Sequence, residues 1–221
     1  MIGAAIFDVD GTLVDSVDLH ARAWQEALAH FGYKVDFEEV RSQIGKGGDQ
    51  LLQVFLSRAE LARHGEELEQ YRSNLFKRKY LSQVHGFPRV RELFQRLLRD
   101  GKRIALASCA KGDELEAYKR AAGIGDLIDT ETSSDDAEKS KPHPDIFEAA
   151  LSRLGNPAPE TTLVVGDTPY DAQAARKAHI YTIGFLCGGF PANSLLQAGC
   201  IALYRDPADL LAKYENSPLA A

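Results

Sequence analysis

Three carboxylates lie close together near the start of the chain, in the stretch AAIFDVDGTLVDS at residues 4–16. Asp8, Asp10 and Asp15 follow an apolar run, AAIF, that predicts a buried strand. Clustered like charges repel one another, so folding alone gives little reason for them. Carboxylates in this pattern suit chemistry, because one can act as a covalent nucleophile, another as a general acid/base, and both can hold a hard cation such as Mg²⁺.

Other reactive side chains follow predicted strands further along the chain. One buried strand ends in Ser108, another leads into the stretch GDTPYD, and Lys141 stands between Ser140 and Pro142 before a predicted helix. In open α/β sheets, ligands bind beyond the carboxyl ends of the strands. We therefore expect one cleft to be lined by these side chains: Asp8, Asp10, Ser108, Lys141, Asp167 and Asp171.

Short apolar runs alternate with helical patterns over most of the chain. This alternation predicts an α/β fold with a doubly wound, mostly parallel sheet. The pattern at 89–101 indicates a helix that ends at Gly101 and whose buried face is Val90, Leu93, Phe94, Leu97 and Leu98. The predicted strands lie at residues 4–7, 103–108, 161–166, 180–185 and 200–204, with a weaker one at 127–131.

One stretch, from Ser16 to His85, has helical periodicity and no convincing strand. Its first apolar face repeats at spacings of four and three: Val17, Ala21, Trp24, Leu28 and Phe31. We predict that residues 16–85 form an all-helical insert, called the helical segment below, which the family resemblance given below identifies as a cap domain. Residues 1–15 and 86–221 are predicted to form the α/β core, with hinges where the chain crosses between the two.

Composition excludes several classes of protein. The 221 residues are 44% hydrophobic and 26% charged, with a formal net charge of -6, which does not favour a nucleic-acid binder. The three cysteines form no CxxC pair, so neither a disulfide framework nor a zinc site is indicated. No apolar run approaches the roughly 18 residues that span a bilayer, and the N-terminus does not resemble a signal peptide. We expect a cytoplasmic protein without nucleic-acid or membrane partners.

Taken together and in this order, the motifs resemble those of the haloacid dehalogenase-like hydrolase superfamily, in the subfamily with a helical cap. DVDGT at 8–12 matches the DxDGT motif, Ser108 the Ser/Thr motif, Lys141 the Lys motif and GDTPYD at 166–171 the GDxxxD motif. The resemblance covers the whole chain, including the helical segment after the first motif. It implies Mg²⁺-dependent chemistry on a small phosphorylated metabolite, by a monomer or homodimer.

The resemblance also implies roles for the acidic residues. Asp8 is expected to attack phosphorus and form an aspartyl-phosphate, and Asp10 to act as general acid and then base. Asp8, Asp167 and the backbone carbonyl of Asp10 are expected to hold Mg²⁺. Asp171 is expected to orient a ligand or Lys141 from behind, although a first-turn helix aspartate is an equally good reading.

The remaining residues are expected to hold the phosphate. Ser108 and Lys141 would neutralise the charge of the transferring phosphoryl group. Backbone N–H groups of Gly11, Thr12 and Cys109 are expected to face it. Taken singly, Ser108 is also a good helix cap, and a lone lysine is usually solvated.

Asp10 favours phosphoryl transfer, because true haloacid dehalogenases lack a second aspartate there. The stretch VGDTPYDAQAARKA resembles the phosphoglycolate phosphatase-like subgroup, so a phosphatase of small phosphate monoesters is our first prediction. LHARAWQEAL at 19–28 and IALASCAK at 104–111 resemble beta-phosphoglucomutase, in which the histidine matching His20 lies near the reacting groups. That mutase, with Glu-Asp where this chain has Gly166 and Asp167, is the alternative.

Two further alternatives stay open. In phosphonoacetaldehyde hydrolase, a relative that cleaves a carbon–phosphorus bond, a cap lysine forms a Schiff base, and Lys46 in IGKGGDQ is the candidate here. The surrounding residues do not match that cap, so Lys46 is expected to contact substrate from its Gly-flanked loop or to face water. A receiver-like phospho-aspartate switch is the non-enzyme alternative. Receivers carry no helical insert, and Asp10 would make the phospho-aspartate short-lived.

Overall fold

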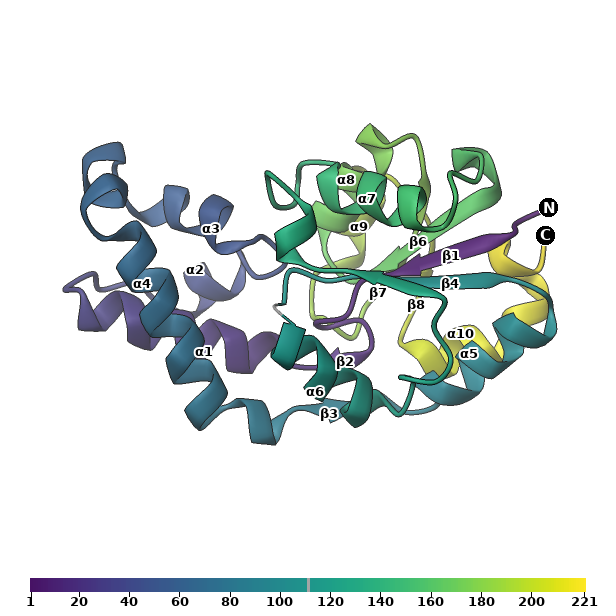
Figure 1. Ribbon diagram of the computed structural model, residues 1–221, viewed down its shortest axis with the longest axis horizontal. Coiled ribbons are helices and arrows are strands. Elements are labelled where there is room, and N and C mark those ends of the chain that lie inside the picture. Colours follow the sequence, from purple (N-terminus) through teal and green to yellow (C-terminus); the bar gives the residue numbers. More distant parts are fainter. Residues whose placement is uncertain (111) are drawn as a thin grey trace.

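The computed structural model describes residues 1–110 and 112–221, and in them a six-stranded parallel sheet forms the centre of the molecule (Figure 1). The strands stand in the order β5-β4-β1-β6-β7-β8, so the first strand of the chain is central. The α/β prediction is thereby confirmed, and the weak strand lies slightly later than predicted. The strands are β1 (Ala4–Phe7), β4 (Arg103–Ala107), β5 (Thr130–Thr132), β6 (Thr162–Gly166), β7 (Tyr181–Phe185) and β8 (Cys200–Tyr204).

Strand β1 is buried on both faces, as a central parallel strand should be. Ala5 and Phe7 pack into one hydrophobic cluster, and Ala4 and Ile6 into another on the opposite face, because side chains alternate along a strand. Helices α7, α8 and α9 lie above the sheet in Figure 1, and α5, α6 and α10 below it. Their bounds are Val90–Arg99 (α5), Gly112–Ala122 (α6), Asp145–Arg153 (α7), Pro169–Lys177 (α8), Ala192–Ala198 (α9) and Pro207–Ala212 (α10).

One residue of the predicted face of α5 is not buried. Val90, Leu93, Phe94 and Leu97 are buried, whereas Leu98 is 38% exposed. An α-helix turns by about 100° per residue, so Leu98 lies a quarter turn away from Leu97 and toward solvent.

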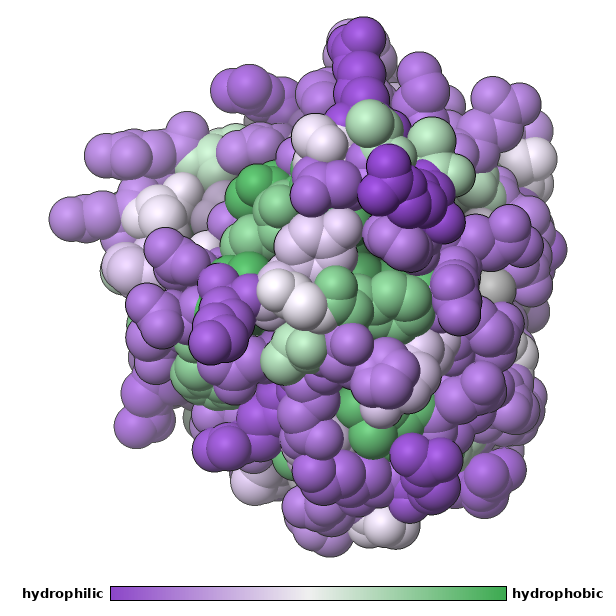
Figure 2. Space-filling view, turned by 90° about the vertical axis from the view of Figure 1, so that its left-hand side faces the viewer, coloured by the Kyte–Doolittle hydropathy of each residue, from purple (hydrophilic) through white to green (hydrophobic). Residues whose placement is uncertain are grey.

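The helical segment has a hydrophobic cluster of its own, which includes Trp24, Leu28, Leu52 and Leu68. Viewed from the end of the molecule that the helical segment forms, the surface is mostly hydrophilic with small hydrophobic areas (Figure 2). Among the described residues, no helix combines the length and the apolar character needed to cross a membrane. The division into two domains stays a prediction. The helices are α1 (Val17–His30), α2 (Phe37–Arg41), α3 (Gly48–Phe55) and α4 (Arg58–Lys79).

A two-stranded ribbon that the sequence did not predict stands where the chain enters and leaves the helical segment. Strand β2 (Val14–Asp15) pairs antiparallel with β3 (His85–Gly86). A Cβ at Gly86 would lie 2.6 Å from the carbonyl oxygen of Ala121, so only glycine fits there. Asp15 is exposed in this ribbon, which separates the third carboxylate of the opening stretch from the other two.

Candidate active site

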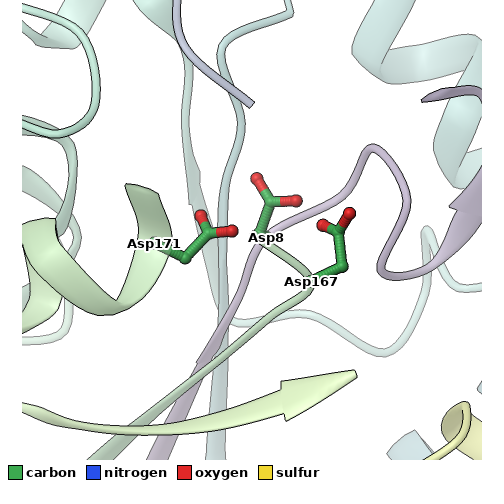
Figure 3. Close-up of side chains that lie close together, drawn as sticks. All are labelled: Asp8, Asp167 and Asp171. Carbon is green, nitrogen blue, oxygen red and sulfur yellow. The ribbon is translucent and has the colours of Figure 1, made fainter. Parts of the chain in front are cut away.

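Three buried aspartates meet at the carboxyl ends of β1 and β6, which are neighbours in the sheet (Figure 3). Asp8 directly follows β1, Asp167 directly follows β6, and Asp171 lies in the first turn of α8. Each offers a carboxylate oxygen within 4.8 Å of the others. The convergence expected from the parallel sheet is therefore present for these residues.

Asp171 links the start of α8 to Lys141. Its Oδ2 accepts hydrogen bonds from the Thr168 N–H at 3.0 Å and the Thr168 hydroxyl at 2.7 Å, in a capping box. Its Oδ1 accepts from Lys141 Nζ at 2.8 Å. The Lys141 ammonium also donates to Asp8 Oδ1 and is 1% exposed, so it is not a solvated lysine. Asp171 thus contacts Lys141 and also lies in the capping box of α8, and its functional role stays a prediction.

Burial and charge set the ionisation of this cluster. Burial, with Asp171 and Asp10 adding to it against the opposing charge of Lys141, raises the pKa of Asp8 to about 7. Burial and the charges of Asp8 and Asp171 raise the pKa of Asp167 well above its ordinary value. Burial alone would lower the pKa of Lys141, but Asp171 and Asp8 raise it. The aspartates therefore resist ionising together unless a further positive charge joins them.

The residues present fit a divalent cation. Asp167 Oδ1 accepts a hydrogen bond from the Thr12 hydroxyl at 2.9 Å, but Asp167 Oδ2 is buried and has no partner among the described residues. A buried carboxylate oxygen without a donor is costly, and a hard cation is the partner that carboxylates accept in place of one. Added Cβ atoms at Gly11 and Gly188 would lie 2.3 and 1.7 Å from this oxygen, so two glycines make room around it.

The Asp10 side chain points to different partners. Its Oδ1 accepts from the Ser16 hydroxyl at 2.6 Å and lies 2.8 Å from His20 Nε2. Burial alone would raise the pKa of Asp10, but the charge and hydrogen bond of His20 and the bond from Ser16 lower it. Asp10 is therefore held as a carboxylate apart from the three-aspartate cluster, and its predicted metal contact through the backbone carbonyl stays a prediction.

His20 is held from the other side by Arg72 of α4. The Arg72 guanidinium contacts Nδ1, whereas Asp10 lies at Nε2 on the opposite side of the ring. Tyr118 of α6 also contacts Nε2, at 3.0 Å, and the ring stacks on Phe76 with centroids 4.0 Å apart. His20 thus joins the helical segment to the core at Asp10.

The loop after β1 corrects one expectation. The N–H of Gly11 donates to the carbonyl of Val14, and that of Thr12 to the carbonyl of Val9, so neither faces a phosphate. The reason is local: the chain turns sharply here, with Gly11 at φ +76°, and the turn uses its own donors. Thr12 contributes through its hydroxyl instead, between Asp8 and Asp167.

Ser108 and Cys109 lie differently from one another. The Ser108 hydroxyl is fully buried and accepts from the Ala110 N–H at 3.0 Å, a bond within the loop that precedes α6, so the helix-cap interpretation stays a prediction. Cys109 is partly exposed, and burial raises the pKa of its thiol to about 11, so it stays protonated. Their contacts with a phosphate stay predictions.

A cavity of about 80 Å³, called the inner cavity below, lies between the helical segment and the core. Lys46 lies on it with its amine 2.6 Å from Gln43 Oε1 and 4.7 Å from the centre of the Tyr170 ring, and burial lowers its pKa. Predicted residues that line it are Asp8, Asp10, His20, Lys46, Cys109 and Lys141. Predicted residues that do not line it are Gly11, Thr12, Ser108, Asp167 and Asp171.

The sequence did not point to three other residues that line the inner cavity. They are Trp24, Arg72 and Glu114. Trp24 was read only as part of an apolar face, and Arg72 and Glu114 lie in charged helical stretches without a motif. No local signal distinguishes them, because the packing of α1, α4 and α6 brings them to the cavity.

Comparison with known proteins gives a family. The family model for Haloacid dehalogenase-like hydrolase matches residues 5–185. Phosphoglycolate phosphatase from Yersinia pseudotuberculosis is 34% identical over 192 residues, covering 85% of this chain and 82% of its own length. Fructose-1-phosphate phosphatase YqaB from Escherichia coli is 29% identical over 178 residues, 78% of this chain and 90% of its own. Protein SUPPRESSOR OF QUENCHING 1, chloroplastic, from Arabidopsis thaliana is 31% identical over 186 residues, which are 82% of this chain but 18% of that longer protein.

Solved structures agree with this result. A hydrolase from Pseudomonas syringae superposes with a TM-score of 0.88 at 29% identity, covering 97% of this chain and 98% of the other. A beta-phosphoglucomutase from Clostridium difficile gives a TM-score of 0.78 at 22% identity, covering 100% and 98%. At that identity the second likeness concerns the fold alone.

Proposed function

The chain belongs to the haloacid dehalogenase-like hydrolases, and on that premise we propose that it is a metal-dependent phosphatase of small phosphate monoesters. The resemblance read from the motifs is thereby confirmed. The observation that carries the proposal is the placement of Asp8. Its carboxylate lines the inner cavity and contacts Lys141, and one of its oxygens lies within 4.8 Å of an Asp167 oxygen.

We assign the resident metal to Asp8 and Asp167, with Mg²⁺ as the ion that suits their oxygens. When bound, it would supply positive charge that favours ionised aspartates and stabilises charge on phosphate oxygens. Asp171 is less suited as a ligand, because its carboxylate already accepts three hydrogen bonds, two from Thr168 and one from Lys141. Asp8 accepts from Lys141 and shares the single Thr12 hydroxyl proton with Asp167. The role of Asp171 is to hold the Lys141 ammonium in place.

The first chemical step uses Asp8 and Asp10. A carboxylate oxygen of Asp8 bonds to phosphorus as the bond from phosphorus to the ester oxygen breaks, and Asp10 gives its proton to that departing oxygen. The Lys141 ammonium offsets negative charge on the phosphoryl group. The Lys141 side chain is 1% exposed, so water screens this interaction only weakly. The products are an alcohol and an aspartyl-phosphate on Asp8.

The second step reverses the role of Asp10. Asp10 takes a proton from a water molecule, the water oxygen bonds to phosphorus, and the Asp8 carboxylate leaves with inorganic phosphate released. The lowered pKa of Asp10 favours the ionised form that this step needs. The first step needs the protonated form, and the negative charge of an incoming phosphate raises the pKa of Asp10 by repulsion.

The mutase alternative has one observation for it and one against it. His20 does contact Asp10, as the resemblance to the mutase implied. At the position of the mutase glutamate, however, a Cβ on Gly166 would lie 2.6 Å from Cβ and Cγ of Asp171. A side chain there would displace Asp171 from Lys141. The local packing therefore favours the phosphatase.

The test is phosphate release from a panel of monoesters with Mg²⁺ and with EDTA. The panel includes fructose 1-phosphate and beta-glucose 1-phosphate, with glucose 6-phosphate measured in parallel. We expect metal-dependent release from at least one ester by the wild-type chain and none by Asp8→Asn. Conversion of the 1-phosphate to the 6-phosphate without release would replace the phosphatase by the mutase. Full activity of Asp8→Asn would refute the scheme.

Three further proposals concern the substrates, the compartment and the oligomeric state. The substrates we propose are small phosphorylated metabolites, and the proposed compartment is the cytoplasm. The oligomeric state, monomer or homodimer, is a prediction that size-exclusion chromatography with light scattering would decide.

A further inference from the structure

A second and larger cavity adjoins the inner one. It measures about 380 Å³ and lies between α3 and α4 of the helical segment and residues 134–140 of the core. It is called the outer cavity below. The residues that line both cavities are Trp24, Gly47, Gly48, Arg72, Cys109 and Glu114. The part of a phosphate ester that does not react therefore has space in the outer cavity when its phosphate lies at Asp8.

Charge is distributed unequally between the two cavities. Lys46 and Lys141 line the inner one. Among the described residues that line the outer one, Arg72 is the single cation; its Nη2 contacts His20, and its Nε is buried without a described partner. The carboxylates that line the outer cavity are Asp49, Glu66, Glu69, Glu114, Asp135 and Glu138. The lining of the outer cavity is thus acidic, and its acidic side chains come from both the helical segment and the core.

Glu114, on α6, is the acid at the junction. It is 3% exposed although it lines both cavities. The hydrogen bond described for its carboxylate is one from the Tyr118 hydroxyl at 3.4 Å, which is long for an O–H···O bond. Buried carboxylates are normally satisfied by several donors, because leaving them without donors is costly. Glu114 therefore has acceptor capacity that a ligand in the cavity can use.

We propose that the outer cavity selects phosphate monoesters whose alcohol part carries hydrogen-bond donors and no negative charge. This inference rests on the proposed phosphatase activity and names its substrate class. Hydroxyl or ammonium groups of the leaving alcohol would donate to Glu114 and its acidic neighbours. A carboxylate in the same place would face six carboxylates against the one guanidinium of Arg72, in a partly dehydrated space where repulsion is stronger than in water.

The proposal separates this chain from a substrate that a relative's name suggests. Phosphoglycolate ends in a carboxylate, whereas 2-hydroxyethyl phosphate has the same skeleton with a terminal hydroxyl. We expect kcat/KM for 2-hydroxyethyl phosphate to exceed that for phosphoglycolate by about tenfold or more, from repulsion by several carboxylates at an intermediate dielectric. An equal or greater kcat/KM for phosphoglycolate would overturn the proposal.

Removing one charge tests the residue at the junction. Glu114→Gln should reduce the preference for 2-hydroxyethyl phosphate over phosphoglycolate by about threefold, because a neutral amide no longer repels a carboxylate. Glu116→Gln is the matched control, since Glu116 lies on the same helix, is exposed and pairs with Lys119 outside both cavities. An unchanged ratio in Glu114→Gln, equal to that of Glu116→Gln, would refute the assignment of Glu114.

A second variant covers the case in which Glu114→Gln fails to fold, and the pattern of phosphate release distinguishes the two ways in which the proposals can fail. If Glu114→Gln does not fold, judged by circular dichroism, the same ratio is measured in Glu66→Gln, whose exposed position on α4 tolerates substitution. Failure of the proposed function gives no metal-dependent phosphate release from any ester. Failure of the specificity inference gives release with a ratio that favours phosphoglycolate, so the two failures are distinguishable.

Discussion

Two helices of the core begin with the same local pattern, and only one of them begins at the three-aspartate cluster. Helices α8 and α10 follow parallel strands in the stretches TPYD and DPAD, with proline at the first helical position. The aspartates at the third position, Asp171 and Asp209, are both buried and both accept a backbone N–H near the start of their helix. By local criteria they are equivalent.

Their long-range partners differ. Asp171 binds Lys141, which is 1% exposed and also contacts Asp8. Asp209 binds Arg205 and Lys213, whose side chains are 79% and 59% exposed and four residues away in sequence. Strand β6 stands next to β1, whereas β8 is at the edge of the sheet. Position in the sheet, and not the helix-start pattern, makes one aspartate part of a candidate active site.

The largest effect is expected at Asp8, which shares the Lys141 ammonium with Asp171 at the start of α8. Replacing Asp8 by Asn removes the nucleophile and should lower kcat by roughly 10⁴-fold or more. Phosphate release with saturating Mg²⁺ measures this. Asp209→Asn, assayed beside it, should retain kcat within about twofold, because no cavity contact is lost. A comparable loss in both variants would remove the distinction between the two helix starts.

The next effect compares the two aspartates directly. Asp171→Asn should lower kcat by about 10–100-fold, because Lys141 loses the partner that orients it. It should also cost about 3 kcal/mol of unfolding free energy, as a buried ion pair is broken. Asp209→Asn should cost about 1 kcal/mol or less, since its cationic partners are exposed. Urea unfolding in EDTA gives both values, and equal costs would contradict the comparison.

Metal binding should separate the same regions. Mg²⁺ at about 100 times its Kd should stabilise the wild-type chain by about 2.7 kcal/mol. Asp167→Asn should lose most of this stabilisation and Asp209→Asn none, because the unpartnered oxygen belongs to Asp167. Thermal unfolding with and without Mg²⁺ measures the shift. A full shift in Asp167→Asn would place the metal elsewhere.

The smallest effect is a difference of sign in pH dependence, measured in EDTA. Burial alone would raise the pKa of Asp209, but hydrogen bonds from Arg205 and Lys213 lower it to about 2. Its contribution to stability is present above the ordinary pKa of 3.8 and is lost as pH falls through about 2. The pKa of Asp8 is raised to about 7, so stability relative to Asp8→Asn is greatest below 3.8 and is lost as pH rises through 7. Parallel trends in Asp8→Asn and Asp209→Asn would show that the two carboxylates do not differ.

Patterns local to the chain predicted much of the fold. Buried strands, helix faces and the order of the motifs depend on spacings of two to four residues, which the sequence displays directly. These patterns did not predict that Leu98 is exposed or that β2 and β3 pair in a ribbon. The first depends on the angle between neighbouring residues on a helix, and the second on pairing Val14 with Gly86 across the whole helical segment.

The candidate site divides along the same line. That Asp8, Asp167 and Asp171 follow strands could be inferred from the sequence by itself, because parallel strands end at one edge of a sheet. Only the tertiary structure decided which donors the turn at Gly11 uses and where the Asp10 side chain points. It also decided that Arg72 and Glu114 reach the cavities. These contacts join segments far apart in the chain, and their distances are set by how helices pack and not by any spacing along the sequence.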